Sequence, residues 1–276
     1  MRSDLSHKGK GAPSAQRHYN PISLCTSMRI LATLHRWWGI AFCLLFAMWF
    51  ASGIVMHFVP YPARTEAPYP AAIDTSHAST EIIDYDQWTV AGHFDRDRPL
   101  KRIALHDAAG TEIYLSIASG TVVLTTTSNQ RIANYAGSIP HWLYETELRH
   151  HRRAWVALVW WLSLLATIGA ALGAILGLLR LNKATPYTGL YRWHHISGLI
   201  FAPFLLTWIF SGFLSMDDGT LFGDSNTLFR ALHKLDFEPL TSHPVLRASA
   251  IVMLCLCGFA FSITGVVLAW RRLRAA

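Results

Sequence analysis

Four long stretches without any Asp, Glu, Lys or Arg dominate the hydrophobic pattern of the chain. They cover residues 37–63, 154–179, 193–216 and 248–270. Each stretch exceeds the roughly 20 apolar residues that a helix needs to cross the hydrocarbon core of a bilayer. A helix also satisfies its own backbone hydrogen bonds, as a segment in lipid must. The pattern therefore predicts an all-α membrane protein with four transmembrane helices.

The basic residues outside these stretches predict the orientation. Of the 24 Lys and Arg residues, twelve lie in residues 1–36, in the 180–192 link and at the C-terminus, together with one acidic residue, Asp4. The remaining segments hold the other twelve basic residues and 16 of the 17 acidic ones. Since cytoplasmic loops carry an excess of Lys and Arg, we expect both termini in the cytoplasm and residues 60–150 and 217–246 outside.

The composition agrees with a membrane protein and argues against a nucleic-acid-binding function. Charged residues make up 15% of the chain and hydrophobic residues 52%, whereas a soluble domain carries about 25% charged residues. The net charge is +7, but the basic residues are scattered, so we expect no nucleic-acid partner.

The predicted boundaries are a basic tail 1–36, spans 37–59, 151–180, 193–216 and 247–271, outer segments 60–150 and 217–246, a cytoplasmic loop 181–192 and C-terminal residues 272–276.

The first outer segment is predicted to hold a small α+β module. Residues 60–80 are rich in Pro, Ala and Thr and indicate an extended linker. A short helix over 85–94 is expected to precede three strands, over 102–106, 111–116 and 121–124, which turns separate. The module contains no nucleophile constellation and no glycine-rich phosphate loop.

An internal duplication relates the two halves of the chain. A shift of 159 residues superposes six positions of the first span on the third: His35 on His194, Gly39 on Gly198, Phe42 on Phe201, Trp49 on Trp208, Ser52 on Ser211 and Gly53 on Gly212. A shift of 92 residues relates the second span to the fourth: His141 falls on His233, His151 on His243, Gly173 on Gly265 and Arg180 on Arg272. The repeats predict two duplicated helical hairpins, with the module inserted between helices 1 and 2 and with sites at the repeat interface.

The matched histidines suggest a haem protein. Eighteen residues make five helical turns, so His35 and Gly53 share one face of their helix. Two such helices facing each other can offer the imidazoles of His35 and His194 to one haem iron, which proteins hold axially through histidine among other ligands. Arg36 and Arg192 flank this inner pair and would neutralise haem propionates.

The outer ligands stay open at this point. The candidates are the matched pairs His141/His233 and His151/His243, and also His57, whose repeat partner is Met216. Solvated loop histidines are the plain alternative for each. Zinc is the other metal to consider, but it favours closely spaced ligands, and no His-Glu-x-x-His motif is present. His195 directly follows His194, so the two point about 100° apart and are not expected to reach the same site.

Several stretches resemble the PepSY-associated transmembrane family of bacterial inner-membrane proteins. They are Leu34–Gly39, Ser52–Met56, Pro140–Tyr144, Tyr191–His195, Trp208–Gly212 and Leu232–Phe237, and the resemblance extends over residues 30–274. It implies that the outer segment is a PepSY-like module and that the chain carries b-type haem, two groups in all. The positions carried over for cofactor binding are His35, His141, His194, His195 and His233, with haem iron held by all of these except His195.

The resemblance also implies an activity similar to that of ferric-siderophore reductases. The expected function is electron transfer across the inner membrane to a ferric chelate outside, with no single catalytic side chain. No flavin or nicotinamide fingerprint is present, so the donor would be a quinol or another protein. Two alternatives remain: a non-redox module that binds or inhibits a periplasmic protease or peptide, and an accessory subunit of a transporter. The charge-free spans disfavour an ion-coupled carrier.

Overall fold

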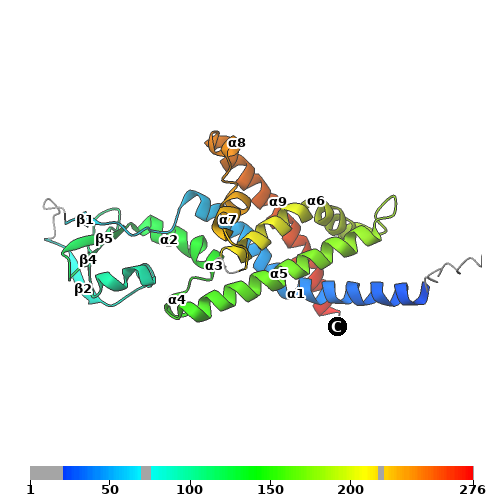
Figure 1. Ribbon diagram of the computed structural model, residues 1–276, viewed down its shortest axis with the longest axis horizontal. Coiled ribbons are helices and arrows are strands. Elements are labelled where there is room, and N and C mark those ends of the chain that lie inside the picture. The colour runs from blue at the N-terminus through cyan, green and yellow to red at the C-terminus, as the bar shows by residue number, and fades with distance from the viewer. Residues whose placement is uncertain (1–20, 70–75, 217–220, 276) are drawn as a thin grey trace, which may run out of the picture.

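The computed structural model describes residues 21–69, 76–216 and 221–275. Four long helices form a bundle, and a small antiparallel sheet lies beyond one end of it (Figure 1). The helices are α1 (Pro21–Phe58), α5 (Arg152–Arg180), α6 (Gly189–Leu214) and α9 (Pro244–Arg274). All four are long and apolar enough to cross a membrane. By length and composition the chain is therefore a multi-pass membrane protein, and the four long apolar helices that the sequence predicts are confirmed.

The helix ends differ from the prediction mainly at the N-terminus. The first helix begins at Pro21, well inside the stretch 1–36 that was predicted to be a basic tail. Residues 1–20, which hold most of the predicted basic tail, lie outside the described residues. The other three helices begin and end within four residues of the predicted boundaries, because charged or polar residues flank each apolar run.

Within the bundle, α1 packs most extensively against α9, and α5 packs most extensively against α6. Small residues allow these close approaches, as is common in membrane helices. A Cβ on Gly258 of α9 would lie only 2.6 Å from the Phe50 ring, and one on Gly177 of α5 would lie 2.9 Å from Leu199. Glycine at these crossings therefore sets the distance between the helices.

Aromatic rings fill the middle of the bundle. Phe50 of α1 contacts Phe201 and Trp208 of α6, with ring centroids 5.6 and 5.8 Å apart. Phe261 of α9 continues the array, at 6.3 Å from Phe201 and stacked at 5.0 Å on the ring of His194. The array thus runs from His194 through the core to Trp208.

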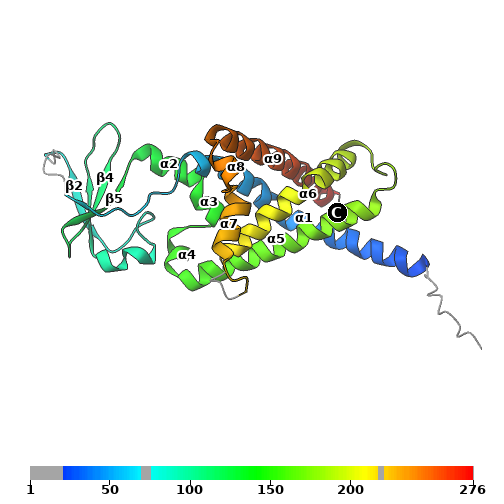
Figure 2. The ribbon, with the colours of Figure 1, turned by 45° about the horizontal axis from the view of Figure 1, so that its top comes forward.

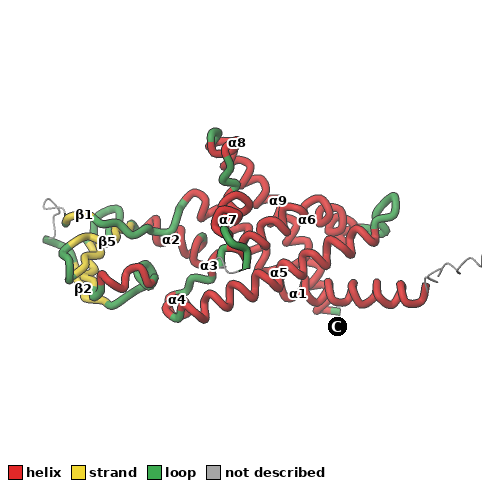
Figure 3. Tube along the Cα trace, in the orientation of Figure 1, coloured by secondary structure: helices red, strands yellow, loops and turns green. Residues whose placement is uncertain are grey.

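The sheet module has five strands rather than the three expected. Its strands, yellow in Figure 3, follow the order β1-β5-β4-β3-β2, and all neighbours are antiparallel. The strands are β1 (Ala67–Pro68), β2 (Ser79–Ile83), β3 (Leu100–Ala104), β4 (Glu112–Ser116) and β5 (Thr121–Thr126). The two additional strands are the edges, and both come from or adjoin the predicted linker. Their residues are largely exposed, so they lack the alternation that marks a half-buried strand.

The helix predicted over residues 85–94 is wrong. This stretch forms turns followed by a 3₁₀ helix, Gly92–Asp97. The carboxylate of Asp86 accepts hydrogen bonds from the backbone N–H groups of Trp88 and Thr89. Such a local Asp turn competes with helix formation. Trp88 and Phe94 instead pack against one face of the sheet, on Leu100, Tyr114 and Leu124.

Short helices lie between the sheet and the bundle and between α6 and α9 (Figure 2). They are α2 (Ser128–Ala136), α3 (Ser138–Trp142) and α4 (Thr146–His150) before α5, and α7 (Ser225–Lys234) and α8 (Glu238–Thr241) before α9. α3 packs against α1, and α7 packs against α6. Both α3 and α7 end at a leucine with left-handed backbone, Leu143 and Leu235, with φ of 51° and 50°.

Candidate functional site

The structure brings four of the predicted histidines together as two pairs, one toward each end of the bundle. The rings of His35 and His194 lie with centroids 6.4 Å apart, and those of His141 and His233 lie 6.0 Å apart. We call the first the loop-end pair, because the loop after α5 lies there, and the second the sheet-end pair. The 18 residues of α1 that separate His35 from Gly53, which contacts His141, span about 27 Å along the helix.

Both spacings suit two imidazoles that bind one metal ion from opposite sides. With nitrogen–metal bonds of about 2.0–2.1 Å, as histidine makes to zinc, the two ring centroids lie roughly 6.3 Å apart. Nε2 of these four histidines makes no hydrogen bond to the described part of the chain. In each pair, one nitrogen of each ring is therefore not used by the protein and can bind a ligand.

The sheet-end pair is held by matching hydrogen bonds in the two halves. His141 Nδ1 lies 3.1 Å from the carbonyl oxygen of Trp49 and 3.1 Å from Ser52 Oγ. His233 Nδ1 lies 3.1 Å from the carbonyl oxygen of Trp208 and 3.0 Å from Ser211 Oγ. A carbonyl oxygen only accepts, so Nδ1 carries the proton in both rings and Nε2 is the free acceptor.

Burial keeps the sheet-end histidines neutral. Desolvation, together with the neighbouring His233, lowers the pKa of His141 to about 3, although the hydrogen bond to the Trp49 carbonyl acts in the opposite direction. Desolvation likewise lowers the pKa of His233 to about 4. A neutral imidazole with a fixed Nδ1 proton is the form that ligates a metal through Nε2.

The loop-end pair borders a cavity of about 410 Å³. Nδ1 of His194 lies 2.8 Å from Thr264 Oγ1, whose own proton goes to the Phe261 carbonyl, so the threonine accepts from the ring. The His35 ring faces the Gly169 carbonyl, yet its buried Nδ1 makes no hydrogen bond of normal geometry within the described residues. The cavity is of the size of a small-molecule site, which is typically about 300–1,000 Å³.

Each of the four rings rests on a glycine. A Cβ on Gly173 would lie 2.6 Å from His35 Cε1, and one on Gly265 would lie 3.7 Å from His194 Cε1. At the sheet end, a Cβ on Gly53 would lie 3.5 Å from His141 Cε1. The corresponding distance from Gly212 to His233 Cε1 is 3.8 Å. The approach is close only at Gly173; Gly53, Gly212 and Gly265 contact their imidazoles at ordinary distances.

Two arginines border the loop-end cavity. They are Arg36 and Arg272. Arg192, which was predicted to take part, is not among the residues that line it, because its side chain lies on an exposed face of α6. Arg272 lies at the end of α9, and only the tertiary fold brings it to this cavity. The site thus combines two imidazoles, a void and two cations.

His195 lies beside the same cavity but uses both of its ring nitrogens. Nε2 lies 2.9 Å from the Gly177 carbonyl oxygen and Nδ1 lies 2.7 Å from Thr185 Oγ1. Because the carbonyl only accepts, Nε2 carries the proton and Nδ1 accepts from the threonine. His195 therefore links α5, α6 and the connecting loop, and neither nitrogen is left for a metal.

The alternative outer histidines do not form pairs. His151 contacts its neighbour His150, and His243 is exposed, with Nδ1 near the Pro239 carbonyl. His57 packs against Phe58, while Met216 packs in a separate cluster with Tyr144 and Trp155. Of the outer candidates that sequence reasoning left open, the structure brings together only His141 and His233.

The donor set fits haem better than zinc. Structural zinc needs four protein ligands and catalytic zinc usually three, and the described residues contain no group of three or more His, Cys, Asp or Glu suited to a metal ion. Two opposed imidazoles suffice where a macrocycle supplies the equatorial nitrogens, as in haem. The loop-end cavity, its two histidines and its two arginines fit such a group with carboxylate substituents.

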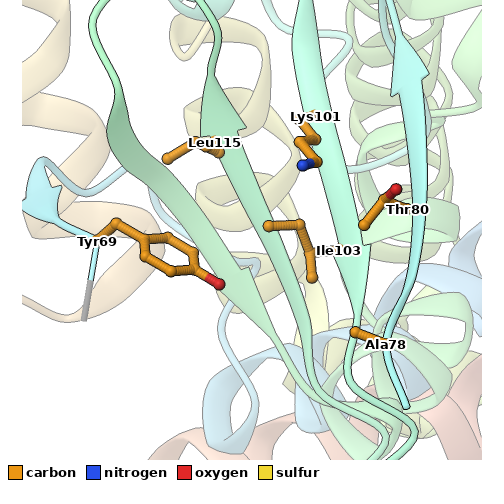
Figure 4. Close-up of a pocket in the computed structure, with 6 residues that line it drawn as sticks. All are labelled: Tyr69, Ala78, Thr80, Lys101, Ile103 and Leu115. Atoms are coloured by element: carbon orange, nitrogen blue, oxygen red, sulfur yellow. The ribbon is translucent and has the colours of Figure 1, made fainter. Parts of the chain in front are cut away.

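A second hollow lies on the sheet, away from both histidine pairs. It has a volume of about 310 Å³ and is lined by Tyr69, Ala78, Thr80, Lys101, Ile103 and Leu115 (Figure 4). The Lys101 amine and the Tyr69 hydroxyl lie along an otherwise largely apolar surface. Figure 1 places the sheet beyond α2, so this groove belongs to a separate part of the molecule.

Sequence reasoning missed the residues that orient the rings. The repeated Ser-Gly dipeptides, Ser52-Gly53 and Ser211-Gly212, carried a usable signal, but the serine hydroxyls were not assigned to the outer histidines. Thr264 gave no signal, because the residue 92 positions earlier is Leu172. A contact between α6 and α9 was needed to reveal it.

Comparison of the chain with protein-family models, with curated proteins and with solved structures gives no match.

Proposed function

We propose that the chain is a b-type haem protein of the bacterial inner membrane that carries electrons across the bilayer to a ferric chelate outside. The observation that carries the proposal is the occurrence of two opposed histidine pairs, 6.4 and 6.0 Å between centroids, toward opposite ends of one apolar bundle. A pair near each membrane surface suits a protein that moves charge from one side to the other.

The proposed architecture is two duplicated hairpins, α1 with α5 and α6 with α9, with a PepSY-like module inserted in the first. Matching contacts support it. The packing of α3 on α1 corresponds to that of α7 on α6, and the α1–α9 contact corresponds to the α6–α5 contact. The hydrogen bonds of His141 to Trp49 and Ser52 recur at His233 as those to Trp208 and Ser211, whose numbers differ by the same 159 residues.

The residues of this chain would hold and orient the cofactor. His35 and His194 would ligate one haem, and His141 and His233 a second, while Arg36 and Arg272 would neutralise carboxylates at the loop end. When bound, haem supplies reversible one-electron chemistry. The protein contributes ligation, exclusion of water and positioning. With both termini cytoplasmic, the loop-end pair faces the cytoplasm, and the electron donor is a quinol or another protein.

The groove on the sheet favours one other function. A surface that combines Tyr69, Lys101 and apolar side chains suits a peptide, as in a membrane-anchored module that binds or inhibits a periplasmic protease. This function needs neither histidine pair, which is why we place it second.

The absorption spectrum of the purified protein, oxidised and dithionite-reduced, tests the proposal. We expect a low-spin b-type spectrum and two haems per chain. His35→Ala or His194→Ala should remove one haem, and His141→Ala or His233→Ala the other. His151→Ala and His243→Ala are the matched controls, because these two histidines also align in the repeat but do not pair with each other. Protein without haem, purified from haem-replete cells, would contradict the proposal.

Vesicles test the direction of transfer. Right-side-out vesicles supplied with an impermeant ferric chelate should release ferrous iron, and those carrying His141→Ala or His233→Ala should not. Undiminished ferric reduction in both variants would rule out the outward path through this pair.

A further inference from the structure

The two histidine pairs differ in what their Nδ1 protons face. We propose that Ser52 and Ser211 are positioning residues that hold His141 and His233 as Nδ1–H tautomers and make the sheet-end pair the more electron-donating of the two. This inference rests on the proposed haem function and adds to it a difference in redox potential between the two sites.

The serine protons show how the sheet-end network is arranged. Ser52 Oγ donates to the Met48 carbonyl at 2.7 Å, and Ser211 Oγ donates to the Trp208 carbonyl at 2.9 Å. Each hydroxyl has therefore used its only proton within its own helix, and its lone pairs face the neighbouring imidazole. The Nδ1 proton of each histidine consequently meets two acceptors, the serine oxygen and a tryptophan carbonyl oxygen, at 3.0–3.1 Å.

The serines also lie where they can control ring orientation. Both are buried, at 2% and 0% exposure, and each directly precedes the glycine on which the ring rests. A Ser-Gly pair thus supplies an acceptor for Nδ1 and a contact for Cε1 from adjacent residues. This arrangement fixes Nδ1 of His141 against α1, and the second Ser-Gly pair fixes Nδ1 of His233 against α6 in the same way.

The loop-end pair has fewer acceptors. His194 Nδ1 faces the Thr264 hydroxyl alone, and His35 Nδ1 has no hydrogen bond of normal geometry among the described residues. An acceptor for the distal N–H raises the basicity of a ligating imidazole. A more basic ligand stabilises the oxidised metal ion, so the sheet-end site should have the lower midpoint potential.

Serine substitutions in the full-length protein test this inference. The variants are Ser52→Ala, Ser211→Ala and their combination, with Ser52→Thr and Ser211→Thr as conservative replacements that keep the hydroxyl. Ser163→Ala is the matched control, since it removes a buried serine of α5 without removing a hydrogen bond to a described histidine. The readouts are haem per chain, the two midpoint potentials by spectroelectrochemistry and the electron paramagnetic resonance spectrum of the oxidised protein.

We expect two potentials in the unmodified protein, of which His141→Ala removes the lower. The alanine variants should raise that lower potential, leave the upper one in place and alter only one of the two low-spin resonance signals. They should also weaken retention of one haem by about tenfold, the lower end of the 10–100-fold range for lost outer partners of a metal ligand, since the carbonyl acceptors remain. The threonine variants should restore both properties.

Three results would overturn the inference. His141→Ala could leave the lower of the two midpoint potentials in place, or the serine-to-alanine variants could leave both potentials unchanged. Ser163→Ala could also shift the lower potential by as much as those variants do. Failure of the proposed function is distinct from these, because it would appear as an absence of haem from the unmodified protein.

Discussion

Substitution of Gly173 by alanine should remove the loop-end haem while leaving the bundle folded. The added Cβ would lie 2.6 Å from Cε1 and 3.0 Å from Nδ1 of His35. Non-bonded carbon atoms rest at about 3.5–4.0 Å, so the ring must retreat by roughly 1 Å. Metal–ligand distances are held to within about 0.2 Å, so the retreating Nε2 can no longer bind.

The internal repeat supplies the control for this substitution. Gly265 occupies the position of Gly173 in the second half, but its Cβ would lie at an ordinary 3.7 Å from His194 Cε1. Gly265→Ala should therefore keep its haem. Alanine is a better helix former than glycine by about 1 kcal/mol, so neither variant is expected to lose helix.

Haem content and circular dichroism of the two purified variants measure the outcome. We expect Gly173→Ala to carry about half the haem of the unmodified two-haem protein, with the same helicity. Full haem content and an unchanged spectrum in Gly173→Ala would refute the steric reasoning. Equal losses in both variants would also refute it, because they would point to the cavity volume rather than to the His35 ring.

Three further predictions concern the rest of the chain. His195→Ala should keep both haems but lower stability by about 1–3 kcal/mol, because it removes two hydrogen bonds; thermal unfolding and haem content separate the two effects, and loss of a haem would make His195 a ligand. Reporter fusions at positions 100 and 225 should read periplasmic and those at 186 and 276 cytoplasmic; a cytoplasmic reading at 100 would invert the topology. The hydrogen bond from Arg64 and the charge of its guanidinium hold the pKa of Asp97 below its usual value. This pair therefore stabilises the module above the unfolded pKa of about 3.9, and the contribution is lost as pH falls through the lower folded pKa. The hydrogen-exchange protection factors of the sheet amides should therefore fall in acid, and Asp97→Asn should largely abolish that pH dependence.

The spans could be predicted from sequence because the lipid interior disfavours charged side chains along the whole of a spanning helix. The sequence contains four runs without charged residues, and the four long helices follow these runs closely. The histidine pairs could also be predicted, since the internal repeat aligns His35 with His194 and His141 with His233. Their ligand role remains a prediction.

Features that depend on contacts between distant segments could not be predicted. The edge strand β2 is exposed along most of its length, so hydrogen bonding to β3, not hydrophobic alternation, defines it. Arg272 reaches the loop-end cavity only because α9 packs on α1. Asp86 breaks the helix expected over 85–94 through hydrogen bonds to its own neighbours, a local effect that hydrophobic periodicity does not detect.

The aromatic core between the two histidine pairs has an electrical consequence. The rings of Phe50, Phe201 and Phe261 fill this layer, and the four apolar runs contain no Asp, Glu, Lys or Arg that could carry a proton alongside an electron. Under the proposed function, an electron that crosses the bundle is therefore not accompanied by a proton on these side chains. Each elementary charge moved through the full membrane potential corresponds to about 2.3 kcal/mol per 100 mV. With the cytoplasm negative, that work favours outward transfer, so the energised membrane itself would help drive electrons toward the sheet end.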